Sequence, residues 1–190
     1  MLDDLYMYTI KVTMHAKTDK QHQEVWRVLH VPETSNLGKL MEAVDISFGW
    51  SAVCLSWFIA PGDKPMPDYE NDQDFDVLYK MPIVDNLDKF PLEYEYCIYD
   101  ELREGWMHTI EITDTTAEDG DNVGEHIVCV GGRGVVPPFM QENNYKYCPP
   151  SDEEERDEAD ETYIANVVDL VAINEKLKAP HKPYRMKNHK

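Results

Sequence analysis

The chain has 190 residues, of which 42% are hydrophobic and 29% are charged. These shares are typical of globular proteins and exclude a wholly disordered chain, while the length fits one domain of about 100–200 residues. The charge is unusual, because 18 basic residues stand against 37 acidic ones and give a net charge of −19. Since phosphate binding needs basic patches, this balance argues against direct nucleic-acid binding by the core.

The sequence also lacks the signals of export and membrane insertion. No run of 18 apolar residues is present, so no transmembrane helix is predicted. The first residues, MLDDLYMYTIKV, carry two acids where a secretory signal has bases. The four cysteines form no CxxC pair, which favours reduced thiols. We therefore expect a cytoplasmic protein that does not contact a membrane.

The N-terminal third predicts two strands and a helix. Residues 8–14 and 25–31 alternate apolar and polar side chains, as paired half-buried strands do. Residues 37–48 then place apolar side chains on one helical face. Ser35 or Asn36 can cap this helix, and Gly49 follows it and can end it.

Further strands and two acidic loops are predicted in the middle of the chain. Strands are expected within residues 51–60, 92–99 and 107–113, with a short apolar piece at 127–130. Segment 62–89 has eight acidic residues and three prolines, and predicts a long exposed loop with at most a short strand near 75–78. Segment 114–125 has five acidic residues and no basic one, and predicts a second acidic loop.

The C-terminal part differs from the core domain, which we place at residues 1–150. Residues 151–178 predict a helical segment that begins at a capping box, Ser151–Glu154, and 179–190 predict a basic flexible tail. Before residue 151 the chain holds 27 of its 37 acidic residues and 11 of its 18 basic ones. The negative charge therefore belongs mainly to the core domain.

The order of these elements predicts an α+β fold. We expect a single mixed β-sheet packed on one main helix, in a β-grasp-like ββαβββ arrangement, with the C-terminal helix added to it.

Three segments, taken in order, resemble a known family. They are VPETSNLGKLMEAVDISFGW at residues 31–50, the box from Tyr99 to His108, and the box from Cys129 to Pro138. Over about residues 6–178 they are similar to the Ri-plasmid ORF-three-like family, although Val136 stands where that family has a cysteine. The resemblance implies an α+β single domain of the kind carried by plasmids and transposons, some of which are labelled resolvase-like. It implies no agreed chemistry.

Asp100, Trp106 and His108 form the strongest candidate site. In a ligand pocket, His108 would titrate near pH 7 and Asp100 would orient it. The alternative is a structural turn in which Trp106 packs and His108 bonds a buried carbonyl. An enzyme would use Asp100, His108 and Glu111 as catalytic residues, but a regular strand places His108 and Glu111 on opposite faces.

Metal binding has only weak candidates, namely His126, Cys129 and Cys148. Zinc takes four nitrogen or sulfur ligands, usually in close pairs, and His126-x-x-Cys129 is the single close pair. We therefore predict no metal and no cofactor.

The preferred interpretation is a non-catalytic interaction or regulatory module of a mobile-element family, with a protein partner that has a basic surface. One alternative is an acidic nucleic-acid mimic that inhibits a basic DNA-binding protein or nuclease. The other is an enzyme with a histidine–carboxylate site at Asp100 and His108. The sequence does not determine the oligomeric state.

Overall fold

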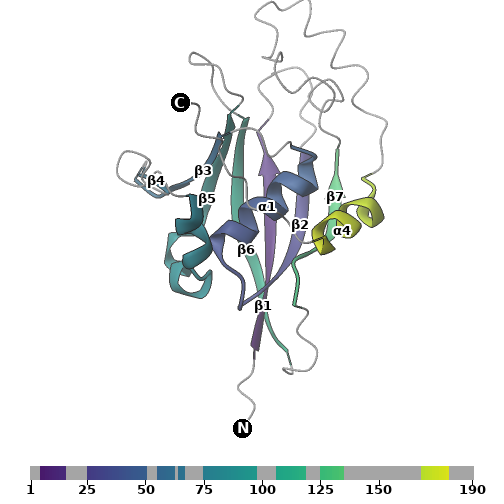
Figure 1. The fold of residues 1–190 in the computed structure, drawn as a ribbon, viewed down its shortest axis with the longest axis horizontal. Coiled ribbons are helices and arrows are strands. Elements are labelled where there is room, and N and C mark those ends of the chain that lie inside the picture. The colour runs from purple at the N-terminus through teal and green to yellow at the C-terminus, as the bar shows by residue number, and fades with distance from the viewer. Residues whose placement is uncertain are drawn as a thin grey trace, which may run out of the picture.

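The structure is a computed structural model that describes residues 5–15, 25–50, 55–62, 64–66, 75–97, 106–118, 125–134 and 168–179. Its strands are β1 (Leu5–Met14), β2 (Val25–Pro32), β3 (Leu55–Ala60), β4 (Lys64–Met66), β5 (Leu92–Cys97), β6 (Trp106–Glu118) and β7 (Val128–Arg133). The helices are α1 (Leu37–Phe48), the 3₁₀ helices η1 (Phe75–Lys80) and η2 (Val84–Lys89), and α4 (Leu170–Lys178). The strands form one seven-stranded sheet in the order β4-β3-β5-β6-β1-β2-β7, with α1 across one face (Figure 1).

The α+β class is confirmed, but the expectation of a mixed sheet is wrong. All six strand pairs of the described sheet are antiparallel. Antiparallel neighbours need no crossover helix between them, which parallel strands do require. The β-grasp-like arrangement is not confirmed by this strand order.

The hairpin and the helix predicted from the N-terminal third are both present. β1 pairs with β2 on one side and with β6 on the other. Asn36 caps α1, since its side-chain oxygen accepts a hydrogen bond of 2.9 Å from the Lys39 N–H. Gly49 ends the helix at φ 78°, in the left-handed region that glycine adopts most readily.

The core lies between the sheet and α1. The inward side chains of β1 alternate with more exposed ones, as the period of two predicts. Ile10 and Val12 are fully buried, and so are Leu40 and Val44 on the facing side of α1. The face of the sheet away from α1, which we call the outer face, carries the intervening side chains.

The prediction of a long exposed loop over 62–89 is wrong. This segment contains the short strand β4 and both 3₁₀ helices, and residues 75–78 belong to η1 rather than to a strand. Leu78 and Ile83 are fully buried and anchor the segment in the core. The acidic residues and prolines of this segment indicated exposure to solvent, but Leu78 and Ile83 pack it against the core.

The prediction of a loop over 114–125 is wrong for its first part, because β6 continues to Glu118. Leu5–Thr9 of β1 pair with Asp114–Glu118, past a register shift between Thr9 and Ile10. The long β1 supplies backbone partners that local composition does not reveal. Residues 119–124 lie outside the described chain.

The C-terminal helix is confirmed in its described part, α4, where Asp169 caps the first turn through a 3.0 Å bond from the Ala172 N–H. The expected capping box at Ser151–Glu154 and most of the tail at 179–190 lie outside the described residues. In the described residues, the helices are too short or too polar to cross a membrane.

Candidate functional site

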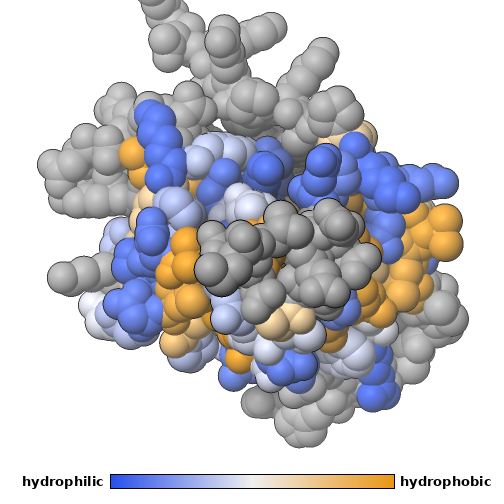
Figure 2. Space-filling view, turned by 90° about the horizontal axis from the view of Figure 1, so that it is seen from below, coloured by the Kyte–Doolittle hydropathy of each residue, from blue (hydrophilic) through white to orange (hydrophobic). Residues whose placement is uncertain are grey.

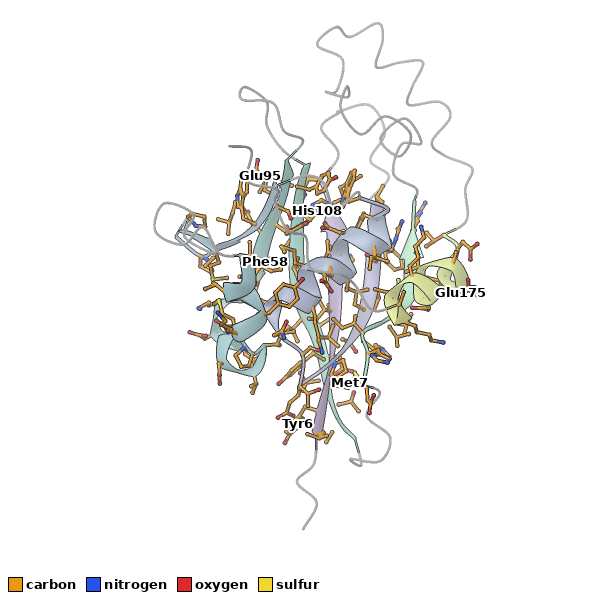
Figure 3. All side chains as sticks on the ribbon, viewed as in Figure 1. Tyr6, Met7, Phe58, Glu95, His108 and Glu175 are labelled. Atoms are coloured by element: carbon orange, nitrogen blue, oxygen red, sulfur yellow. The ribbon has the colours of Figure 1, made fainter. Side chains whose placement is uncertain are left out.

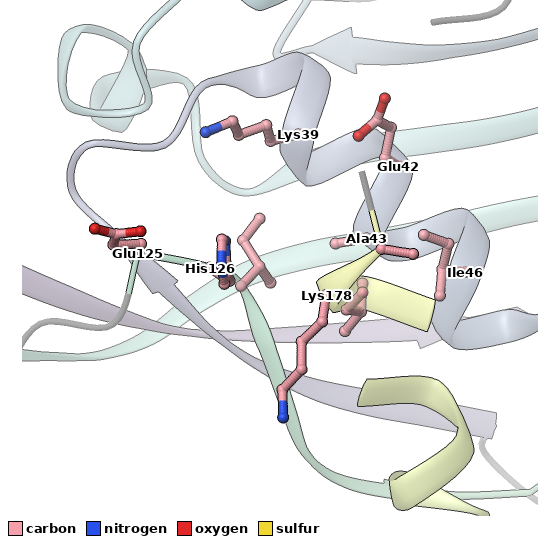
Figure 4. A pocket seen from close by; sticks show the side chains of 10 residues that line it. Lys39, Glu42, Ala43, Ile46, Glu125, His126 and Lys178 are labelled. Atoms are coloured by element: carbon pink, nitrogen blue, oxygen red, sulfur yellow. The ribbon is translucent and has the colours of Figure 1, made fainter. Parts of the chain in front are cut away.

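A pocket of about 290 Å³ lies between α1, α4 and the segment that enters β7 (Figure 4). Its apolar wall includes Ala43 and Ile46 from α1, Ile127 before β7 and Leu177 from α4. The remaining lining is charged or lies at the rim: Lys39, Glu42, Glu125, His126, Lys178 and Ala179. Three segments that are distant in the sequence thus form one hollow.

The charged groups of this pocket are of mixed sign. Lys39 and Lys178 are exposed cations, while Glu125 is an exposed carboxylate beside His126. The Glu42 carboxylate accepts a hydrogen bond from the Tyr79 hydroxyl. Opposite charges around an apolar floor can orient a small molecule, but among the described residues the lining includes no serine, threonine or cysteine that could act as a nucleophile.

His108, the main residue of the predicted site, lies elsewhere, in the core behind α1 (Figure 3). Its Nε2 accepts a hydrogen bond of 3.3 Å from the Trp50 indole N–H, and its Nδ1 lies 3.2 Å from the Tyr94 carbonyl oxygen. Because Nε2 accepts, Nδ1 must carry the ring proton and donate to that carbonyl. The Phe48 ring packs edge-on at 4.9 Å. Both nitrogens of His108 thus have partners within the protein.

A second titratable pair, Asp45 and Tyr94, lies next to His108. The Tyr94 hydroxyl donates to the Asp45 carboxylate. Burial raises the pKa of Asp45 from 3.8 to about 7, the hydrogen bond from Tyr94 opposes that rise, and the charge of Glu42 adds to it. Burial also raises the pKa of Tyr94 well above its usual value. Asp45 occupies the last turn of α1, where the helix dipole further disfavours a negative charge.

Arg27 is a buried cation that the sequence reasoning missed. Its guanidinium donates to the carbonyl oxygens of Ser47 at 2.8 Å, Trp26 at 2.8 Å and Arg133 at 3.0 Å, and lies over the Phe48 ring. Burial lowers its pKa to about 10, and the neighbouring Cys129 acts in the opposite direction. The available signal was its position, because Arg27 is inward in the period-two pattern of β2. It ties β2, α1 and β7 together.

The two predicted catalytic residues that the structure describes, His108 and Glu111, lie on opposite faces of the sheet. His108 and Ile110 point into the core from β6, whereas Glu111 is exposed on the outer face. Asp100 lies outside the described residues, and of Trp106 only the backbone, at the start of β6, is described.

Of the three weak metal candidates, the structure describes His126 and Cys129. His126 is exposed at the pocket rim, Cys129 is buried in β7, and Cys148 lies outside the described chain. Over the described ranges, no group of three histidine, cysteine, aspartate or glutamate side chains is placed to hold a metal ion.

The outer face of the sheet gathers acidic side chains on β5 and β6. Glu93 pairs with Thr109, Glu95 with Met107, Glu111 with Lys11 and Asp114 with Thr9. Glu93, Glu111 and Asp114 are exposed and Glu95 is half-buried. We call these four residues the acidic stripe. Trp57 lies beside it, because β3 pairs with β5 through Trp57 and Glu95.

Seen from below, the described surface carries hydrophilic and hydrophobic patches side by side (Figure 2).

Comparison with known proteins establishes the family. Residues 6–164 match the plasmid pRiA4b ORF-3-like proteins, and the chain belongs to this family. The crystal structure of a protein of unknown function from Methanosarcina mazei Go1 is similar in fold, with a TM-score of 0.52 and 19% identity, over 73% of this chain and 76% of that chain. No curated protein matches the chain. The family and the fold are therefore known, and neither specifies a reaction.

Proposed function

We propose that this chain is a non-catalytic interaction module whose acidic stripe binds a protein partner with a basic surface. The strand register carries the proposal, because it places the four carboxylates of the stripe on the same side of two adjacent strands. Lys11 is the basic side chain that the register sets among them, opposite Glu111. Complementary charge of this kind speeds association and selects partners.

The inward polar groups support a binding role over a catalytic one. His108, Asp45 and Arg27 all have hydrogen-bond partners within the protein, and each helps to fix α1 against the sheet. Trp57 adds a half-buried aromatic ring next to the carboxylates, and aromatic side chains often supply much of the binding energy at protein interfaces.

The test compares two doubly substituted proteins with equal changes in net charge. Glu93→Lys with Glu111→Lys brings the net charge of the stripe to zero, whereas Asp85→Lys with Asp88→Lys makes the same change at two exposed acids of η2. Each immobilised protein is incubated with a lysate of the native organism, and captured proteins are quantified by mass spectrometry. We expect a basic protein whose capture by the stripe variant falls about tenfold, which corresponds to about 1.4 kcal/mol.

Capture by the wild type should also weaken as salt rises from about 50 to 200 mM, because screening shortens the range of the attraction. Equal loss with the two doubly substituted proteins would show that only net charge matters and would refute the proposal. A nucleic-acid mimic is the narrower alternative, and displacement of the captured protein by duplex DNA would favour it.

A further inference from the structure

The two edges of the sheet are protected in different ways. β4, at one end, has three residues, and its Pro65 hinders the addition of another strand. β7, at the other end, has six residues, of which Val128 and Val130 are 37% and 42% exposed. Its sequence VCVGGR has no proline and no charge before Arg133. By composition, β7 is therefore the edge more prone to pair with another strand.

A single side chain of α4 covers the β7 edge at Cys129. The Asn174 Oδ1 accepts from the Cys129 N–H at 2.8 Å, and the Asn174 Nδ2 donates to the Cys129 carbonyl oxygen at 2.9 Å. An amide that makes both bonds reproduces what a neighbouring strand would offer to this residue. α4 lies alongside β7 at the edge of the sheet (Figure 1).

The attachment of α4 is modest compared with that of α1. None of its nine residues is buried, although Leu170, Ile173 and Leu177 pack half-buried against the core. Val171 on the same helix is 71% exposed. Elements with little buried apolar surface open at the low end of the stability range of a protein. Detachment of α4 from the β7 edge should therefore cost less free energy than unfolding of the sheet.

We propose that the β7 edge is a strand-addition site that α4 keeps closed, and that its occupant is β7 of a second copy of this chain. An antiparallel pair of identical edges is self-complementary about a two-fold axis, so each strand presents the donors and acceptors that the other requires. Val128 and Val130 of both copies would meet across this junction on the outer face. The two sheets would then form one continuous sheet.

This interface is independent of the acidic stripe and has the opposite response to salt. Each copy carries a net charge of −19, so the two chains repel each other at low ionic strength. Salt screens this repulsion and should strengthen the self-association. Binding of a basic partner to the stripe weakens under the same change, so the failure of one proposal is distinguishable from the failure of the other.

The main test is Asn174→Leu, with Glu175→Ala as the matched control. Asn174→Leu removes both bonds to Cys129 and puts an apolar side chain of similar size in their place, while Glu175 is exposed at the next position of the same helix. The net free energy of one hydrogen bond changes an equilibrium constant roughly fivefold. The loss of both bonds should therefore raise the fraction of chains in which α4 is detached from β7 roughly 25-fold. Because two chains must open, the apparent dimer dissociation constant should fall by several hundredfold, on the order of the square of that change.

Sedimentation velocity at about 50 and 500 mM salt measures this shift, with the larger dimer fraction expected at high salt. In the same background, Val130→Lys places like charges across the proposed junction and should restore the monomer. Asn174→Asp keeps an acceptor for the N–H but loses the donor to the carbonyl, and should also promote dimers if Asn174→Leu does not fold.

Hydrogen exchange at the Cys129 amide gives a second readout. It should be slow in the wild type, at least fivefold faster in monomeric Asn174→Asp at low concentration, and slow again in the dimer. Monomers at every concentration in both Asn174 variants would overturn the proposal. Association that Val130→Lys leaves unchanged would overturn it as well.

Discussion

Asp45 should make the stability of the protein depend on pH in a direction opposite to that of most acidic groups. Its folded-state pKa is about 7 against an ordinary value of 3.8, chiefly because burial disfavours the carboxylate. Between these two pH values the folded chain holds a proton that the unfolded chain has released. The stabilisation is fully present below pH 4 and is lost as the pH rises through 7.

The magnitude follows from the size of the shift. Each unit of pKa corresponds to about 1.4 kcal/mol, so a shift of roughly three units amounts to at most about 4 kcal/mol. Asp45→Asn keeps an oxygen that can accept from the Tyr94 hydroxyl and cannot ionise. We expect this variant to exceed the wild type in stability at pH 8 by up to about 4 kcal/mol, and to show little difference at pH 4.

Urea unfolding of both proteins at pH 4, 5, 6, 7 and 8 measures this difference. Asp85→Asn is the control, because it removes one exposed charge of η2 and reports the general effect of lowering the net charge. The reasoning would be refuted if Asp45→Asn and wild type differed by the same amount at pH 5 and pH 8. It would also be refuted if Asp85→Asn reproduced the full trend.

Two further predictions concern the packing around α1. His108→Ala should lower the free energy of unfolding by about 3 kcal/mol, because it leaves a cavity and removes the bonds to Trp50 and Tyr94. Glu111→Ala, on the outer face of the same strand, should change the free energy of unfolding by less than about 0.5 kcal/mol. Equal losses of stability in the two variants would contradict the assignment of His108 to the core. A Cβ added at Gly38 would lie 2.7 Å from the Tyr79 ring, so Gly38→Ala should cost about 2 kcal/mol in urea unfolding. In a Tyr79→Ala background the clashing Cγ and Cδ atoms are absent, so the higher helix propensity of alanine should make Gly38→Ala neutral or stabilising by up to about 1 kcal/mol.

The sequence alone determined the elements in which local pattern and tertiary environment agree. Period-two alternation located β1, β2, β5 and the first half of β6, because a strand with one face in the core must alternate. The apolar face, a cap at Ser35 or Asn36 and the following Gly49 located α1 with its two ends, and the structure shows that Asn36 is the cap. The alternation around His108 and Glu111 also indicated correctly that these two side chains point to opposite faces. Three sequence boxes in the expected order indicated the family, and the match of residues 6–164 to that family confirms it.

Composition was misleading where a few residues decide the outcome. Acids and prolines predicted loops at 62–89 and beyond residue 113, yet Leu78 and Ile83 anchor the first segment. The far end of β1 adds the second segment to the sheet. The burial of Arg27 was not predicted, because a charged side chain can be inward only if it finds hydrogen-bond partners. Its partners are carbonyls from three separate elements, which the sequence pattern does not show.

What only the tertiary structure decided is which distant groups meet. The antiparallel order of the sheet, the acidic stripe, the pocket between α1 and α4, and the contact of Asn174 with Cys129 all join residues far apart in the chain. A sequence pattern reports on which face of its own element a residue lies, because that is fixed by local geometry. Which residue of another element it contacts depends on how the elements pack together, and therefore on the free energy of the whole fold.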